Sequence, residues 1–531
     1  MASRRDELNA YTFARKRMVG AFLQPGGGGN DEDAPRPLRA VLPSFVVAAV
    51  VVAGFGMWGV LKPAAPPNWD SGKFVIQGKS STTRYVILND GPNKEPTLHQ
   101  VLNMSSARLV LPENATVQTV ADDVLDKYPR RGATIGIPYA PDKLPAKGDA
   151  GAAKTWSVCD KMGKDNQQSS VGQSVFIAAG QDEKNLKAAD KKLNDHQMLL
   201  VQEPLLNGGH DEGSMYLVDS KGVKHALGKR DMSAKDRRDL LNALSSPDAK
   251  PQQVTKEWLD TLASGQLVDF PRIDTFASAA KSSGTSSLEL SNPEQRKIGR
   301  LLTFQGVYYV VGAQKLYQIT EFQAELMRTD PLLQSAYPKG APTIEDVGAG
   351  DISKLAPVTV KDMITAAGDL PVFKQQAVNV IGSAPRTVVC STYEGVDEKG
   401  GILRSVWAGT GYPAQVTSGS VSAHVTPGHG LLYRAMEGDT LGTDGQAASS
   451  GSDFLITDSG LRYSLPANND GGASGTASAS PDASKANSTN EAQARLGYKD
   501  VLMPRVPAAW SKLVPAGPVL NTNAALQAQN A

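Results

Sequence analysis

One stretch constrains the fold of this chain more than any other: 22 uncharged residues, Ala40–Leu61, bounded by Arg39 and Lys62. As an α-helix it would be about 33 Å long, enough to cross a hydrocarbon core of about 30 Å. Trp58 near its far end fits an aromatic anchor at the membrane interface. A signal peptide is the competing interpretation, but its charged region would be 39 residues long and would contain acidic residues. The run therefore predicts a transmembrane helix.

Small residues recur inside this run, at Ala49, Ala53 and Gly56. Small side chains let two helices approach closely in lipid. A close contact with another helix is one interpretation, although lipid more often merely tolerates such residues.

Charge and thiols predict the orientation of the span. The preceding segment is basic, with Arg36 and Arg39 near the run, which favours a cytoplasmic N-terminus. The bulk of the chain would then lie outside, where disulfides are stable. The two cysteines, Cys159 and Cys390, are too few for a zinc ribbon or an iron–sulfur site. They form either one disulfide, which agrees with this placement, or two unrelated buried thiols.

Residues 1–24 predict an amphipathic helix. Five apolar residues, Leu8, Tyr11, Ala14, Met18 and Phe22, follow helical spacing, and basic residues occupy other positions. A glycine run then begins a linker over residues 25–39. We expect this helix to dock onto a partner; the alternatives are a helix lying on anionic lipid and a solvated arm. The expected contact residues are Leu8, Tyr11, Arg15, Met18 and Phe22.

The remainder predicts an α+β, β-rich fold. The chain has 51 glycines and 33 prolines, which favour many turns. Short β-branched and aromatic runs alternate with turn signals, and helical patterns are fewer. Among these elements we expect a strand at Ala107–Leu111, a short helix at Ile344–Val347 and a helix at Val360–Ala367.

A weak internal repeat organises these elements. Met215–Leu227 and Asp453–Leu465 each read as a strand, a turn with Asp, Ser and Gly, and a second strand. Arg84–Leu111 and Leu301–Thr320 are looser copies. We predict four modules around a central domain that holds both cysteines. The expected boundaries are a spacer at 62–73, the first module at 74–130, the first central segment at 131–200, the second module at 201–270, the third module at 271–350, the second central segment at 351–430, and the fourth module at 431–531 with a mobile insert at 467–490.

No motif predicts catalysis or metal binding. Gly78-Lys79-Ser80 resembles the end of a phosphate-binding loop, but five residues separate it from Gly72 where the pattern needs four. Ser278–Lys281 has the S-x-x-K spacing of penicillin-recognising enzymes without their other motifs. No two of the six histidines are spaced i, i+4. The net charge of +1 argues against nucleic-acid binding, which needs a basic excess. We therefore predict no catalytic residue, metal or cofactor.

The ordered set of segments resembles the EccB family, a membrane subunit of actinobacterial type VII (ESX) secretion systems. The matching segments span nearly the whole chain. They are Ser3–Arg17, the apolar run, Tyr85-Val86, Leu98–Asn103, Ser106–Leu109, Trp156–Cys159, Tyr216–Val218, Thr426–Gly428, Leu496–Tyr498 and Leu513–Leu520. Gln100, where proline is expected, and the insert at 467–490 depart from the family pattern.

The resemblance implies a structural core subunit of a secretion complex in the cell membrane. It also implies an elongated outer region of four repeats about a disulfide-bonded central domain. The expected partners of this subunit are an EccC-like FtsK/SpoIIIE ATPase, an EccD-like protein with many spans, an EccE-like subunit and other EccB copies. The family has also been described as ATP-binding with hydrolase activity, so ATP enters as a cofactor only through the resemblance. The alternative function is an extracytoplasmic hydrolase that acts on ATP or on cell wall. Activity of the outer region, lost on changing one residue, would favour that alternative.

Overall fold

A computed structural model describes residues 4–23, 37–61, 65–90, 93–163, 171–188, 191–204, 213–246, 249–273, 284–358, 368–380, 386–415, 423–438, 441, 451–466 and 490–529. The chain divides into two compact units. Unit 1 consists of residues 1–71, 76–82 and 118–129. Unit 2 consists of residues 72–75, 83–117 and 130–531. Strands β1 (Phe74–Gly78) and β4 (Thr116–Val120) each cross the boundary between the units.

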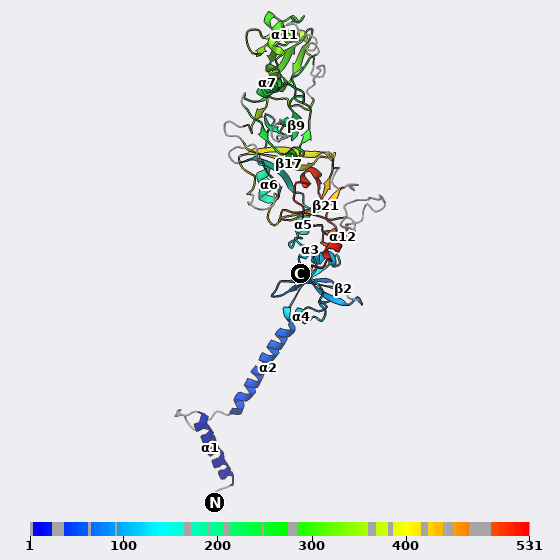
Figure 1. Ribbon diagram of the computed structural model, residues 1–531. Coiled ribbons are helices and arrows are strands. Elements are labelled where there is room, and N and C mark those ends of the chain that lie inside the picture. Colours follow the sequence, from blue (N-terminus) through cyan, green and yellow to red (C-terminus); the bar gives the residue numbers. More distant parts are fainter. Residues whose placement is uncertain are drawn as a thin grey trace. The chain divides into compact units, whose positions relative to one another are not determined.

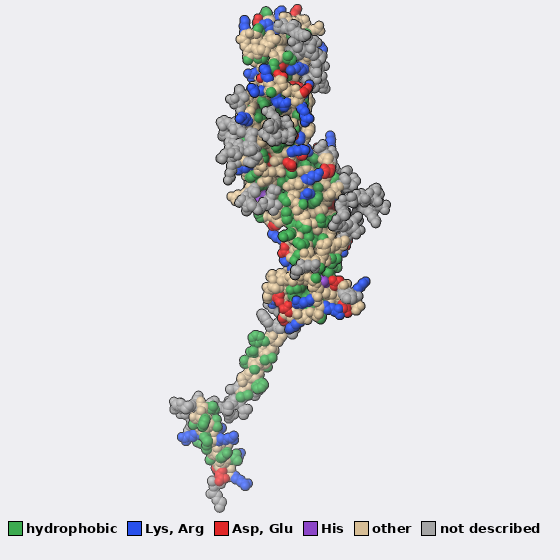
Figure 2. Space-filling view, viewed as in Figure 1, with side chains coloured by type: hydrophobic (Ala, Val, Ile, Leu, Met, Phe, Trp, Pro, Cys, Tyr) green, Lys and Arg blue, Asp and Glu red, His purple; other side chains and the backbone are tan. Residues whose placement is uncertain are grey.

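Unit 1 contains the two N-terminal helices, α1 (Arg4–Leu23) and α2 (Pro37–Leu61), and the short α4 (Asp122–Asp126) (Figure 1). Pro37 begins α2, and proline is tolerated at the first position of a helix because an N–H there would have no partner within the helix. Figure 2 shows hydrophobic side chains along the part of α2 that is drawn in colour. A search of the described residues found no helix with the length and apolarity that a membrane crossing requires. The transmembrane helix therefore stays a prediction, and residues 25–36 of the predicted linker lie outside the described residues.

Three sheets of unit 2 share one connectivity. In each, three consecutive strands form an antiparallel meander, and a fourth strand returns parallel to the first. The first has β7 (Gln197–Gln202), β8 (Met215–Val218), β9 (Val223–Ala226) and β10 (Gln252–Gln253), with β11 (Ala263–Ser264) and β16 (Gln376–Ala377) added. The second has β12 (Leu301–Phe304), β13 (Val307–Val311), β14 (Leu316–Ile319) and β15 (Ile344–Asp346). The third has β20 (Leu431–Met436), β21 (Ser452–Ile456), β22 (Arg462–Ser464) and β23 (Arg505–Pro507).

A further sheet, the central sheet, is built from two distant segments of the chain. Its strand order is β18-β17-β5-β6-β19. The strands are β5 (Thr155–Met162), β6 (Val171–Ala178), β17 (Val388–Val396), β18 (Ile402–Gly409) and β19 (Ala423–Val425). Near the N-terminal end of unit 2, β2 (Arg84–Asn89) and β3 (Pro96–Val101) form an antiparallel pair.

The helices of unit 2 are short. They are α3 (Met104–Val110), α5 (Lys147–Ala150), α6 (Gly180–Leu186), α7 (Ala234–Leu244), α8 (Lys256–Leu259), α10 (Glu321–Arg328), α11 (Ala349–Leu355), α12 (Glu491–Arg495), α13 (Ala508–Ser511) and α14 (Thr522–Ala525), with 3₁₀ turns at Pro293–Arg296 and Leu333–Ala336. The mixture of many short strands and short helices confirms the predicted β-rich α+β class.

Alternating side chains explain how the sheets stack. Leu199 and Val201 of β7 pack in one core with the central sheet, while Met198 and Leu200 pack on the other face. Successive residues of a strand point to opposite faces, so a strand buried on both faces reads as a continuous apolar run. Strand β20 is also buried on both faces: Tyr433 packs in the core of the central sheet, and Leu432 packs in a core with α3. The central sheet therefore lies between the sheets of β7 and β20.

Segments from the two ends of unit 2 meet. Leu109 of α3 shares a core with Leu496 and Leu520, although almost 400 residues separate them. Figure 1 shows α3 and α12 side by side. At the other end, Phe322 of α10 packs with Leu240 of α7.

Two of the local predictions are wrong. Ala107–Leu111, expected as a strand, belongs largely to α3, because the Asn103 side chain accepts a hydrogen bond from the Ser106 N–H and begins a helix. Ile344–Val347, expected as a short helix, is mostly β15, where Ile344 pairs with Leu301. The expected helix at Val360–Ala367 and residues 467–489 of the insert lie outside the described residues.

Candidate functional site

The centre of unit 2 is marked by a disulfide between Cys159 and Cys390. The two residues lie opposite each other on the neighbouring strands β5 and β17. They are 231 residues apart in the chain, and both are fully buried, with Phe176 and Trp407 in the same cluster. The bond that the sequence offered as one of two interpretations thus ties the two segments of the central sheet together.

The residue after Cys159 is a buried carboxylate. Asp160 points to the other face of β5 and is fully buried. Its Oδ2 accepts hydrogen bonds from the Thr255 N–H (2.6 Å) and hydroxyl (2.8 Å), and its Oδ1 accepts one from the Gln173 amide (3.1 Å). Burial raises the pKa of Asp160 to about 6, although these hydrogen bonds oppose the rise. Because Thr255 is the N-cap of α8, Asp160 links the central sheet to the segment that follows β10.

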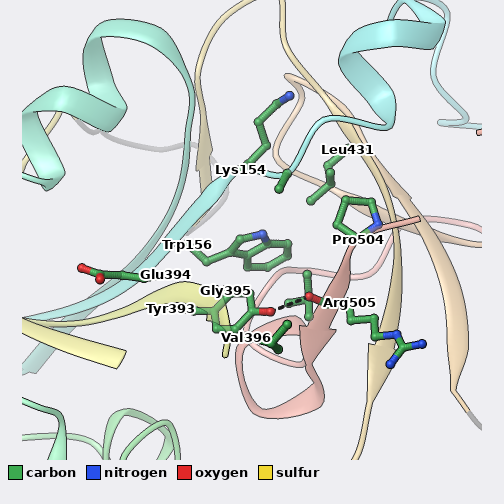
Figure 3. Close-up of a pocket in the computed structure, with 11 residues that line it drawn as sticks. Lys154, Trp156, Tyr393, Glu394, Gly395, Val396, Leu431, Pro504 and Arg505 are labelled. Atoms are coloured by element: carbon green, nitrogen blue, oxygen red, sulfur yellow. Dashed lines mark hydrogen bonds between the residues drawn. The ribbon is translucent and has the colours of Figure 1, made fainter. Parts of the chain in front are cut away.

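A small cavity of about 60 Å³ lies where the central sheet meets β20 and β23 (Figure 3). Its walls include Trp156 of β5, Tyr393 of β17 and Leu431 of β20. Figure 3 shows the charged ends of Lys154, Glu394 and Arg505 pointing away from Trp156. The cavity is therefore lined mainly by apolar and aromatic surface.

The polar groups around this cavity are engaged elsewhere. Lys154 donates to Asp149 Oδ1 at 3.0 Å, and Glu394 accepts from Lys192 at 2.8 Å. The Tyr393 hydroxyl donates to the Arg505 carbonyl at 2.7 Å. Lys154, Glu394 and Tyr393 thus each contact another group of the chain and contribute to the packing between the central sheet and β20 and β23.

A second carboxylate organises the neighbouring turn. Asp149 accepts hydrogen bonds from His429 (2.7 Å) and from the Gly430 N–H (2.9 Å). Burial alone would raise the pKa of Asp149, but the hydrogen bonds from His429 and Lys154 hold it below its ordinary value. The pair fixes α5 against the start of β20.

The resemblance of Gly78-Lys79-Ser80 to a phosphate loop has no structural support. The backbone N–H groups of Ser80 and Ser81 donate to the Asp122 carboxylate at 2.7 and 3.3 Å. The hydrogen bond from the Ser81 side chain lowers the pKa of Asp122 most. The amides that a phosphate would need are thus occupied by a carboxylate of the same chain.

No group of three or more metal-ligating side chains occurs within the described ranges. His424 lies 3.4 Å from Asp182 and His429 contacts Asp149, so each has a carboxylate neighbour rather than a second histidine. His210 and Ser278–Lys281 lie outside the described residues.

The predicted partner-binding residues form one stripe of α1. Their spacing alternates three and four residues, which places them on a single helix face. The four apolar members are strongly exposed, Phe22 to 90%. In α2, Ala49, Ala53 and Gly56 are exposed, and an added Cβ at Gly56 would meet nothing within 4 Å. Neither set is brought together with another site residue. The members of the α1 stripe are Leu8, Tyr11, Arg15, Met18 and Phe22.

Sequence reasoning missed Asp160 and Asp149. The run around Asp160, TWSVCDKM, reads as a strand in which a single carboxylate gives no sign of its burial. Its partner Thr255 is 95 residues away, and only the fold brings the two together. Asp149 and His429 are likewise 280 residues apart.

Known proteins resemble this chain over its full length. Residues 1–531 match the family described as type VII secretion system ESX-1, transport TM domain B. The ESX-1 secretion system ATPase EccB1 of Mycobacterium tuberculosis is 26% identical over 257 residues, 48% of this chain and 47% of that protein. The chain thus matches about half the length of that relative. The ESX-3 secretion system ATPase EccB3 of the same species is 23% identical over 93% of this chain and 83% of that protein.

Solved structures resemble its fold. A chain of an intact ESX-5 inner membrane complex superposes with a TM-score of 0.55 at 18% identity, covering 100% of this chain and 96% of that one. A chain of the EccB3 dimer from the ESX-3 core complex gives a TM-score of 0.54 at 19% identity, covering 86% of this chain and 100% of that one. At these identities the structural likeness shows the fold alone. From the family match over all 531 residues, the chain belongs to the EccB family of type VII secretion systems.

Proposed function

We propose that this chain is a structural subunit of a type VII secretion complex in the cell membrane, linking the membrane core to an assembly outside it. The observation that carries the proposal is the family match over the whole chain. The surroundings of the small cavity between the central sheet, β20 and β23 agree with this proposal, because the described polar groups there are bonded to other groups of the chain.

The proposed topology puts α1 in the cytoplasm, α2 across the membrane and unit 2 outside. After Arg39, α2 carries no charged residue as far as Leu61, which is what lipid requires. The disulfide supports an outside location for unit 2, since disulfides persist in oxidising compartments. Ala49, Ala53 and Gly56 would contact a neighbouring helix in the membrane.

Unit 2 would serve as a scaffold of four modules around the disulfide-bonded central domain. The shared connectivity of three sheets supports the modules, and the central sheet formed from two chain segments supports the central domain. The boundaries proposed for the ten segments are those given from the sequence.

The α1 stripe would dock onto another subunit of the complex. Exposed apolar side chains at alternating three- and four-residue spacing suit a second helix, and Arg15 in the middle suits an acidic partner residue. The proposed partners are EccC-like, EccD-like and EccE-like subunits and further copies of this chain. The energy for transport would come from the EccC-like ATPase.

A secretion assay tests the proposal. A strain lacking this chain should lose export of the substrates of its own type VII system, and the full chain should restore it. Unchanged export in the deletion strain, with the remaining subunits still assembled, would contradict the role.

ATP hydrolysis is the second candidate, because the relatives are named ATPases. Only the purified full chain, free of the EccC-like ATPase, can test it. Hydrolysis that co-purifies with this chain through successive columns would favour an enzyme. Hydrolysis that separates from it would leave the structural role alone.

A further inference from the structure

A large pocket beside β8 and α7 carries an excess of positive charge. Its volume is about 550 Å³, within the range of small-molecule sites. Three cationic side chains line it, Lys229 and Arg230 from the turn after β9 and Arg237 from α7. None of the three has an ion-pair partner among the described residues, whereas Lys235 on the same helix pairs with Asp239 at 2.9 Å.

The one carboxylate in the described wall is already engaged. Glu203 accepts hydrogen bonds from the Ser214 N–H at 3.3 Å and from the Tyr216 hydroxyl at 3.1 Å. Three cations against one such carboxylate leave the pocket with a surplus of about two positive charges. That surplus favours a dianionic ligand.

The local backbone holds the cations in place. Gly228 has a φ of +70°, a conformation that residues with side chains rarely adopt, so the chain can turn sharply before Lys229. The Gly228 N–H donates to the Val268 carbonyl at 2.8 Å, which anchors the turn. Arg237 donates to the Lys229 carbonyl at 3.4 Å and so connects α7 to the same turn.

Part of the pocket wall is apolar. Leu267 is half-buried there, and Met215 and Leu227 beside it are buried. A ligand with an apolar portion would cover the exposed part of Leu267 while its anionic group met the cations. The planar fork of arginine matches phosphate oxygens in pairs, which makes phosphate a better fit than a single negative point charge.

From this geometry we propose that the pocket binds a small phosphate-bearing organic molecule. The site is independent of the assembly role, since it needs neither α1 nor α2. Free phosphate and a phosphate ester share the recognised group and differ in the apolar portion.

Calorimetric titration of the full chain, purified in a non-ionic detergent and a phosphate-free buffer, tests this site. Phenyl phosphate should bind saturably, with an affinity that falls as salt is added. Tighter binding of phenyl phosphate than of inorganic phosphate supports an ester as the ligand, and equal affinity supports free phosphate. Benzoate that binds as well as phenyl phosphate would overturn the assignment to phosphate.

Variants separate the pocket from general surface charge. Arg237→Gln should weaken phenyl phosphate binding by about tenfold or more. Arg238→Gln is the matched control, because Arg238 is the exposed next residue of α7 and does not line the pocket. The double variant Lys229→Gln, Arg230→Gln changes only the exposed turn, so a loss of binding in this variant cannot come from misfolding of α7. Equal losses in Arg237→Gln and Arg238→Gln, or no saturable binding up to about 10 mM, would overturn the proposal.

Discussion

At the scale of single residues, the contribution of Asp160 to the stability of the fold depends on pH. All three of its hydrogen-bond partners are donors, which suits the ionised carboxylate, yet its burial penalises the charge. Burial is the larger effect, because the pKa is raised from 3.8 to about 6. The folded protein therefore holds this proton to a higher pH than the unfolded chain does.

Asp160→Asn should flatten the pH dependence of stability. A raised pKa adds stability below pH 3.8, and that stability is lost as the pH rises through about 6. Between pH 7 and 5 the wild type should gain about 1 kcal/mol more than the variant. Thermal melting of both chains at the two pH values measures the difference, and parallel shifts in Tm would contradict it.

Gly265 lies where the neighbouring side chain leaves no room for a Cβ atom. An added Cβ would lie 2.5 Å from His225 Cε1, and the His225 ring is fully buried with Nδ1 held by the Gln266 carbonyl at 2.9 Å. Gly265→Ala should therefore destabilise the fold by about 1–3 kcal/mol. Gly350→Ala in α11 is the control, because its Cβ meets nothing within 4 Å and alanine favours helices. Equal melting temperatures for the two variants would contradict this interpretation.

The sequence predicted the roles of residues that depend on neighbours in the chain or on the chemistry of the side chain alone. It missed residues whose role depends on partners far away in the sequence. The cysteine pair could be proposed because two thiols in a region predicted to lie outside the membrane have few alternatives. Asp160 could not, since its donors Thr255 and Gln173 come from other elements. The cations Lys229 and Arg237 also looked like ordinary surface residues until the fold placed them around one pocket.

At the scale of elements, the strand patterns were readable because the alternation of side chains is local. The repeat of Met215–Leu227 and Asp453–Leu465 corresponds to β8–β9 and β21–β22, two hairpins with the same pairing. Ala107–Leu111 was misread because apolar residues at short spacing fit both a strand and a short helix, and the Asn103 cap decided the outcome. The parallel fourth strands were not predicted, since their partners lie far away in the sequence.

The contact between α3 and α12 offers a test at this scale. Arg495 donates to the Leu109 carbonyl at 2.9 Å, and Arg108 donates to the Leu496 carbonyl at 3.0 Å. Arg495→Met should cost about 1–2 kcal/mol, because it removes the hydrogen bonds from Arg495 to the Leu109 and Leu111 carbonyls. Lys499→Met removes only an exposed ion pair with Glu113 and should leave the melting temperature unchanged. Equal effects of the two variants would mean that the reciprocal hydrogen bonds contribute nothing.

The disulfide should hold the central sheet together. Cys159→Ser removes a crosslink that closes a long loop, and the expected loss is about 3–5 kcal/mol. After denaturation without reductant, Cys390 should react with a thiol reagent in the variant and not in the wild type. Reaction in the wild type would show that the two thiols are not paired there.

At the scale of the whole molecule, unit 2 brings the N-terminal and C-terminal segments of its chain together. The α3 core with Leu496 and Leu520 and the central sheet with Cys390 both depend on residues late in the sequence. Most of unit 2 must therefore be present before either core can close. The predicted layout placed both cysteines in one central domain, but it did not reveal the core of α3, because it contains no information on which modules touch.

Deleting residues 4–23 tests the role proposed for α1. The described side chains of this helix are largely exposed, so its loss should leave unit 2 folded while the chain leaves its complex. Replacing Leu8 and Phe22 by serine should weaken the association in the same direction. An unchanged complex on a native gel would refute docking through α1.

The most direct test of the proposed role in secretion is the native mass of the particle that carries this chain. The chain would be purified through a C-terminal tag in mild detergent, and the subunits of the particle identified. We expect a large particle that contains an FtsK/SpoIIIE-like ATPase and a protein with many spans. A lone chain or a homo-oligomer, found reproducibly across gentle detergents, would contradict the role.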